Sequence, residues 1–178
     1  MEWTPEAKRV YDVQSYAPRV VIDGVEIVEL KRHHDDGGSM TELGRLTDGA
    51  LAGLKGFTVR QVNFSEIEPG AIKAYHLHPR QTDVWFVPPT DRGLVNLVDV
   101  RKGSPTEGVR MRFMMGAGAS RLVRIPAGVA HGIRNIGATT GTIVYFTDVH
   151  FSPDPKDCEE GRLPWDYLGP DVWDVTRG

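Results

Sequence analysis

Short apolar runs separated by turn residues most constrain what this chain can fold into. From Val20 onward, runs rich in valine, isoleucine and phenylalanine alternate with glycine, proline and aspartate, which is typical of strands and turns. Such evenly spaced strands favour a closed barrel or a two-sheet jelly roll, because closure removes exposed strand edges. The expected strands are residues 25–30, 58–67, 72–77, 83–87, 94–101, 111–115, 120–125, 132–135 and 142–148.

Helices are expected only at the periphery. Residues 5–13 can form a short helix with Pro5 in its first turn, and residues 48–54 another with Thr47 as N-cap. With 178 residues, 40% of them hydrophobic, the chain suits a single domain with a sizeable core. We expect an N-terminal arm (1–24), a barrel (25–152) and a C-terminal tail (153–178) packed on the barrel.

Charge and cysteine content exclude several functional classes. A net charge of -3 disfavours nucleic-acid and anionic-membrane partners, because both attract a basic face. The single cysteine, Cys158, excludes an intrachain disulfide and a multi-cysteine zinc site. No apolar stretch has the character of a signal peptide or a membrane span, so we expect a soluble, cytoplasmic protein.

Two histidine-containing stretches carry the clearest motifs. Residues 70–78 read GAIKAYHLH, and His76 and His78 share one face if this segment is a strand. Residues 126–135 read PAGVAHGIRN, with His131 entering a strand after a Pro and Gly turn. These stretches resemble the paired motifs of the cupin superfamily, which implies an all-β, cupin-type jelly-roll barrel with short peripheral helices.

The same motifs leave a metal site as an alternative. In metal-binding cupins the first motif supplies two histidines and a glutamate, and the second a third histidine. Here the glutamate position is nearest to Asp83. A set of His76, His78, Asp83 and His131 suits a divalent iron, manganese, nickel or zinc ion. In the favoured interpretation, His78 and Asp83 are polar wall residues and the protein uses no cofactor.

A wider set of segments carries a second resemblance. The segments, in order, are 35–42, 61–65, 70–76, 98–106, 125–132 and 145–153. Together they resemble the dTDP-4-dehydrorhamnose 3,5-epimerase family. The resemblance implies a cofactor-free epimerase or isomerase that removes a proton next to the ketone of a nucleotide-activated 4-keto-6-deoxyhexose.

The resemblance also assigns roles to single residues. It makes His76 the general base and Tyr145 the proton donor, and it places His131 beside the sugar. His150 occupies a position where the family usually has a tyrosine. The implied substrate-binding residues are Glu42, Gln61, Asn63, Lys73, His131 and His150.

The chain departs from the family pattern at its charged positions. A phosphate-contacting arginine is replaced by Gly37, the Arg-Gly before the histidine by Lys73-Ala74, and a downstream lysine has no equivalent at 81–83. A diphosphate needs cationic or backbone donors, so either Lys73 and Arg80 take over this role or the substrate is not a standard dTDP sugar. The aspartate that partners the family histidine is not recognisable, which leaves Asp83, Asp148, Asp166 and the aspartates of 171–174 as candidates.

Three functions therefore remain open. The first is the epimerase; the second is a metal-dependent cupin enzyme using His76, His78 and His131; the third is an inactive sugar-nucleotide binder. Family members pair through their barrels, with N-terminal residues reaching the partner's pocket, so the resemblance also implies a homodimer.

Overall fold

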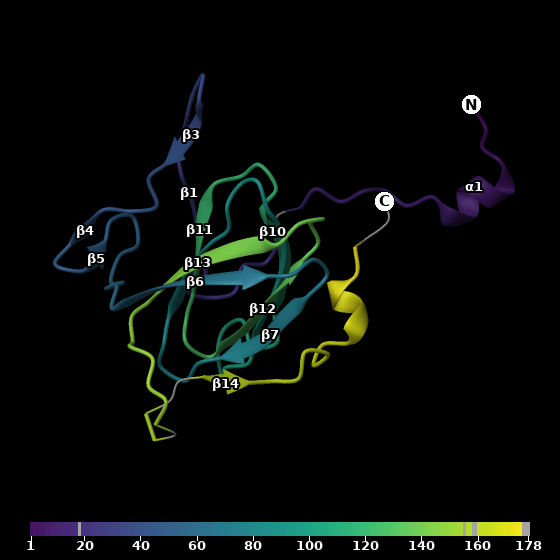
Figure 1. The fold of residues 1–178 in the computed structure, drawn as a ribbon. Helices are drawn as coiled ribbons and strands as arrows, with labels where there is room; N and C mark the ends of the chain where they lie inside the picture. Colours follow the sequence, from purple (N-terminus) through teal and green to yellow (C-terminus); the bar gives the residue numbers. More distant parts are fainter. Residues whose placement is uncertain (18, 155, 158–159, 176–178) are drawn as a thin grey trace.

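The computed structural model describes residues 1–17, 19–154, 156–157 and 160–175, so Cys158 lies outside the described residues. Two five-stranded antiparallel sheets form the body (Figure 1). The first sheet has the order β1 (Glu26–Glu29), β11 (Arg121–Ile125), β8 (Asp83–Phe86), β13 (Gly141–Thr147), β6 (Gln61–Ile67). The second has the order β10 (Arg110–Gly116), β9 (Arg92–Asp99), β12 (Val129–Asn135), β7 (Ile72–Leu77), β14 (Gly161–Arg162).

The main core lies between the inner faces of these sheets. Trp85 and Ile143 of the first sheet belong to the same buried cluster as Leu97 and Ile133 of the second. A second cluster covers the outer face of the first sheet, where Phe86 and Phe146 pack with Leu54 and neighbouring residues. The first sheet is therefore apolar on both faces, and each of its middle strands alternates between the two clusters.

The mostly β class expected from the sequence is confirmed. Each expected strand has a counterpart whose ends shift by a few residues, as strand bounds commonly do. Among the described residues no strand ladder joins the two sheets, so they face each other as open sheets.

The helix expected at 5–13 is present but shorter: α1 spans Pro5–Val10, and the side chain of Thr4 accepts from the Ala7 N–H. The helix expected at 48–54 is wrong. This segment instead belongs to the hairpin of β4 (Leu46–Thr47) and β5 (Ala50–Leu51) (Figure 1), which follows in the chain a hairpin of β2 (Arg32–Asp35) and β3 (Gly38–Thr41). Asp48 and Gly49 have φ of 49° and 82°, as an Asp-Gly hairpin turn requires.

The C-terminal tail packs against the outer face of β7. Leu163 exchanges backbone hydrogen bonds with Tyr75, and the short 3-10 helix η1 (Pro170–Trp173) buries Trp173 against the Tyr75 ring, 5.3 Å between centroids. Trp173 Nε1 donates to the Trp165 carbonyl at 2.8 Å. Neither helix in the described part of the chain has the length and apolar character needed to cross a bilayer.

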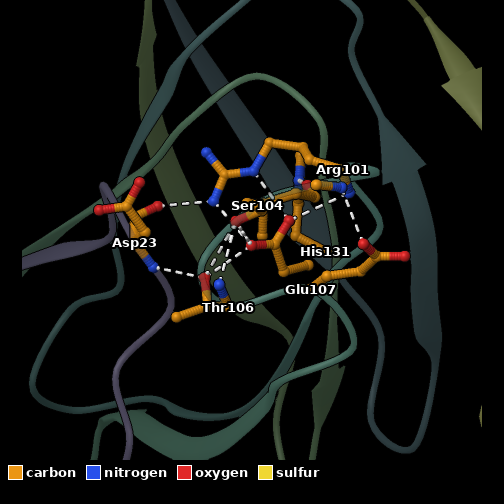
Figure 2. Close-up of polar contacts among 9 residues, drawn as sticks. Asp23, Arg101, Ser104, Thr106, Glu107 and His131 are labelled. Carbon is orange, nitrogen blue, oxygen red and sulfur yellow. Dashed lines mark hydrogen bonds and ion pairs between the residues drawn. The ribbon is translucent and has the colours of Figure 1, made fainter.

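Hydrogen bonds of Asp23 with Arg101 and Thr106 join the N-terminal arm to the loop after β9 (Figure 2). Asp99, at the end of β9, accepts hydrogen bonds from Arg101, Ser104 and Thr106, and these contacts hold its pKa well below the usual range despite burial. Arg101 also donates to the Asp23 carbonyl at 2.7 Å. Because Asp99 pairs with Val129, this network fixes the start of the strand that carries His131.

Candidate active site

A pocket of about 690 Å³ opens between the two sheets, and both supply its walls. The first sheet contributes polar side chains from β6, β8 and β13, and the second contributes side chains from β7, β12 and β14. The polar lining residues include Gln61, Asn63, Asp83 and Tyr145 from the first sheet and Lys73, His76 and Arg162 from the second. The pocket therefore holds acids, bases and cations around a space that fits a small molecule.

Strand β7 places His76 in this pocket. Adjacent strand residues point to opposite faces, so Tyr75 packs under the tail while His76 faces the interior. On the neighbouring strand β12, a register irregularity surrounds Gly132, and a Cβ there would lie 2.3 Å from the Ala74 Cβ. Glycine thus lets the two backbones approach closely beside His76.

His76 has a carboxylate partner that the sequence did not reveal. Its Nδ1 lies 3.5 Å from Oε2 of Glu160, a residue next to the tail strand β14. Burial lowers the pKa of His76, the Glu160 contact opposes that effect, and His131 and Arg162 lower it further. The net pKa lies below the ordinary value of 6.5, so the imidazole is neutral at pH 7 and can accept a proton.

The aspartates expected to partner His76 have other surroundings: Asp83 lines the same pocket but contacts His78 and His131. Asp148 accepts the Thr82 N–H at 2.8 Å, and Asp166 is exposed. No sequence signal distinguished Glu160, because β14 has only two residues and its neighbours read as irregular tail.

Tyr145 faces the same pocket from the other sheet. It belongs to β13, between Asn63 of β6 and Trp85 of β8. Burial raises the pKa of its phenol, and the charges of Asp83 and Glu160 raise it further. The phenol is therefore protonated at neutral pH and can donate a proton from the wall that does not carry His76.

Three buried residues, His78, Asp83 and His131, form a cluster that we call the buried triad. Asp83 Oδ2 lies 3.8 Å from His78 Nε2 and 3.6 Å from His131 Nε2. Burial alone would raise the pKa of Asp83, but His131, His78 and Gln81 lower it to about 2. His78 and Asp83 line the pocket, whereas His131 is 2% exposed and lies behind its wall.

The expected substrate-binding residues divide into two groups. Gln61, Asn63 and Lys73 line the pocket; Gln61 donates to Asn63 Oδ1 at 2.7 Å, and Lys73 donates to Ser65 Oγ at 2.7 Å. Glu42, His131 and His150 do not line it: Glu42 pairs with Arg45 on an exposed loop, His131 is buried in the triad, and His150 contacts the Arg60 carbonyl. Arg162 and Phe151 line the pocket instead, and Arg80 does not.

The pocket between the two sheets holds a neutral imidazole and a protonated phenol. These groups define a class of β proteins that can carry out acid–base chemistry on a bound small molecule. Comparison with known proteins narrows that class. The family described as dTDP-4-dehydrorhamnose 3,5-epimerase matches residues 19–166, and the chain belongs to this family.

Individual relatives agree with this assignment. The chain is 42% identical over 146 residues to the spore coat polysaccharide biosynthesis protein SpsL of Bacillus subtilis (strain 168), covering 82% of this chain and 91% of that protein. A dTDP sugar isomerase from Desulfovibrio desulfuricans G20 superposes with a TM-score of 0.72 at 28% identity, over 83% of this chain and 88% of that one. The epimerase RmlC from Legionella pneumophila Philadelphia 1, solved with dTDP-4-keto-L-rhamnose, gives 0.71 at 25%, over 89% and 82%.

Proposed function

We propose that this protein is a nucleotide-sugar epimerase that acts on a 4-keto-6-deoxyhexose and inverts a carbon next to the ketone. The observation that carries the proposal is the pair His76 and Tyr145, a neutral base and a protonated acid on facing sheets of one pocket. Family membership supports the substrate class, because the Legionella relative was solved with a dTDP-linked 4-keto sugar.

His76 removes the proton in this mechanism. A hydrogen next to a ketone is only weakly acidic, so the reaction needs a positioned base and stabilisation of the enolate. Nδ1 of His76 faces the Glu160 carboxylate, which leaves Nε2 as the accepting nitrogen. When His76 takes up the proton, Glu160 stabilises the resulting imidazolium, as its effect on the His76 pKa indicates.

Tyr145 returns a proton to the same carbon. Because its strand lies in the first sheet and β7 lies in the second, the two groups approach a bound sugar from different walls. A proton that leaves toward one wall and arrives from the other inverts the configuration of the carbon.

Two cations of the pocket hold the diphosphate. Lys73 and Arg162 line the same cavity, and a guanidinium can pair with phosphate oxygens through two hydrogen bonds. Arg162 thus has the diphosphate-binding role that we considered for Arg80. Gln61 and Asn63, which are hydrogen-bonded to each other on β6, offer amide groups to the sugar or the base.

The finer architecture belongs to the same proposal. The two open sheets form a single cupin-type jelly-roll domain, and the working protein is a homodimer in the cytoplasm. Exposed apolar side chains support pairing through β6, an edge strand on which Val62 and Phe64 are 55% and 67% exposed. Phe64→Glu should then yield a monomer in light scattering, whereas exposed Phe151→Glu should not.

Incubation of the protein with dTDP-4-keto-6-deoxyglucose in heavy water tests the activity. Proton NMR follows deuterium at C3 and C5, with His76→Ala as the variant and exposed His34→Ala as the control. We expect exchange that is lost only in His76→Ala. Binding without exchange would favour the inactive sugar-nucleotide binder, and neither binding nor exchange would overturn this substrate class.

A further inference from the structure

We propose that Asn96, Arg112 and Arg134, which we call the tail clasp, are positioning residues for His76. They bind backbone carbonyls near the C-terminus and thereby keep Glu160 and the rest of the tail wall in the pocket. The proposal rests on the proposed epimerase function, because it concerns the same base. None of the three clasp residues lines the pocket, so their effect on the reaction passes through the tail.

The clasp binds three consecutive carbonyls, those of residues 172–174 at the end of η1. Asn96 Nδ2 and Arg112 Nε both donate to the first at 3.2 Å, Arg134 Nη1 donates to the second at 2.7 Å, and Arg112 Nη2 donates to the third at 2.6 Å. The last carbonyls of a helix have no partner within it, and a guanidinium forms stronger hydrogen bonds than a neutral donor does. These residues lie beyond the part of the chain, 19–166, that matches the family.

The clasp is fixed because its members lie on three adjacent strands of the second sheet. Arg112 of β10 is directly opposite Asn96 of β9, and β9 pairs with β10 and with β12 over seven positions each. Leu97 and Ile133 belong to the main core between the sheets, so the side chains next to them in sequence, Asn96 and Arg134, point to the outer face. The tail is therefore anchored to the best-paired part of its sheet.

The rest of the attachment of the tail is narrow. β14 pairs with β7 at two positions, and Leu163 adds one exchange of backbone hydrogen bonds with Tyr75, at 2.9 and 3.2 Å. Trp173 joins this part to the clasp, since its ring packs on Tyr75 and its Nε1 donates to the Trp165 carbonyl at 2.8 Å. A segment with so few paired positions opens locally when its anchor is lost.

The position of the tail matters to the reaction because two of its side chains line the pocket. Glu160 contacts Nδ1 of His76 at 3.5 Å, and Arg162 is the tail's cation in the pocket. Gly161 lies between them, so close to β7 that an added Cβ would be 2.5 Å from the Leu77 carbonyl oxygen. A displacement of about 1 Å in such a site can slow a reaction by roughly 100-fold, even when its cause is remote.

Hydrogen exchange of backbone amides, followed by NMR without substrate, tests whether the clasp holds the tail. Arg134→Met keeps an apolar stem and removes the donors, so exchange of the Leu163 amide should become at least about 10-fold faster. Exchange of the Val95 amide, in β9, should stay unchanged and shows that the sheet remains folded. Arg112→Met is the second variant of the clasp.

Arg124→Met is the matched control for these variants. Arg124 also donates to a backbone carbonyl, that of Lys55 at 3.1 Å, but it lies on β11 of the first sheet. Its side chain is 21% exposed and that of Arg134 is 28% exposed, so the two substitutions remove similar contacts. The control should leave exchange at Leu163 unchanged. Equal exchange at Leu163 in the wild type and in both clasp variants would overturn the proposal.

Titration of the His76 imidazole by NMR tests the effect on the base. His76 faces Glu160 and Arg162 of the tail and His78 and His131 of the sheets. The Glu160 contact raises the pKa of His76, so Glu160→Gln should lower that pKa in the wild-type background. In the Arg134→Met background the same substitution should have little effect, because Glu160 is no longer held beside the ring. An equal shift in both backgrounds would contradict the positioning role.

Steady-state kinetics completes the test. Arg134→Met should lower kcat and raise KM, each by about 10-fold, because Glu160 and Arg162 are displaced together. Arg134→Lys keeps a cationic donor and should recover part of both losses, whereas Arg124→Met should alter neither constant. Exchange and titration need no turnover, so they decide the role of the clasp even if the wild type fails to epimerise the sugar, a result that would overturn the proposed function alone.

Discussion

Nδ1 of His76 lies 3.5 Å from Oε2 of Glu160, the residue directly before the tail strand β14. β14 pairs with β7 through only two residues. The register of that pairing also sets Arg162 opposite His76. The tail is thus a wall of the pocket as well as a cover for the outer face of β7. It supplies both the carboxylate that contacts His76 and one of the pocket's cations.

Glu160→Gln should slow catalysis and change its pH dependence. The carboxylate raises the pKa of His76 against the effect of burial, so its removal lowers that pKa further. Activity is present above the His76 pKa and is lost as the pH falls through it, so the acid limb of kcat/KM should move to lower pH. We expect a fall in kcat of about 10²-fold. Asp166→Asn, an exposed tail variant, is the control; an unchanged acid limb in Glu160→Gln would contradict the pairing.

Tyr145→Phe should separate proton removal from inversion. The variant keeps His76, so exchange of substrate hydrogen with solvent should continue. Formation of the inverted product should fall by roughly 10²- to 10⁴-fold, because no positioned acid delivers the proton. In the wild type the alkaline limb should lie above pH 10, since the pKa of this phenol is raised from its ordinary 10.0. Parallel loss of exchange and inversion would count against the donor role, and Tyr167→Phe serves as the comparison.

Arg162→Gln should weaken substrate binding more than turnover. Hydrogen bonds to a charged group contribute about 1.5–3 kcal/mol, which corresponds to roughly a 10- to 100-fold rise in KM. Steady-state kinetics with the dTDP-linked sugar measures the change, and the exposed Lys102→Gln is the matched loss of charge. An unaltered KM would remove Arg162 from the diphosphate site.

Gly132→Ala should destabilise the fold beside His76. The new Cβ would meet the Ala74 Cβ at 2.3 Å and the Lys73 carbonyl oxygen at 3.0 Å, which the two paired strands cannot absorb without moving. Overpacking of this kind costs about 1–3 kcal/mol in the free energy of unfolding. Chemical denaturation measures this value, with Gly37→Ala as the control. The Cβ added at Gly37 would meet nothing closer than 3.4 Å, so this control should change the free energy of unfolding by less than about 0.5 kcal/mol.

The strands of the two sheets could be predicted because each strand has a recognisable local sequence pattern. Runs such as Gln61–Ile67 and Gly141–Thr147 are rich in β-branched and aromatic residues and end at turn residues. The prediction of a helix after Thr47 was wrong because the small and apolar residues of that segment are also compatible with a helix. Asp48 and Gly49 adopt positive φ there, and the strands around them are too short to show a period of two.

Most of the predicted site residues on strands line the pocket. The period of two predicts this for Gln61 and Asn63, whereas Lys73 and His76 share the pocket because β7 has one extra residue between them opposite β12. Tyr145 lines it as the motif position predicts, and His131 lies on a strand but is absent from the lining. Loop residues such as Glu42 and His150 carry no such constraint and lie outside it. Glu160 and Arg162 were missed because their role depends on a two-residue pairing between distant segments.

The position of Trp85 gives the protein an optical reporter. Its indole lines the pocket, donates to Asp83 and lies edge-on to His131 at 5.1 Å between ring centroids. Trp3 and Trp165 are 42% and 48% exposed, and Trp173 is buried under the tail. Emission from a chain that keeps only Trp85 would therefore respond to a ligand in the pocket, which allows ligand binding to be followed without a label.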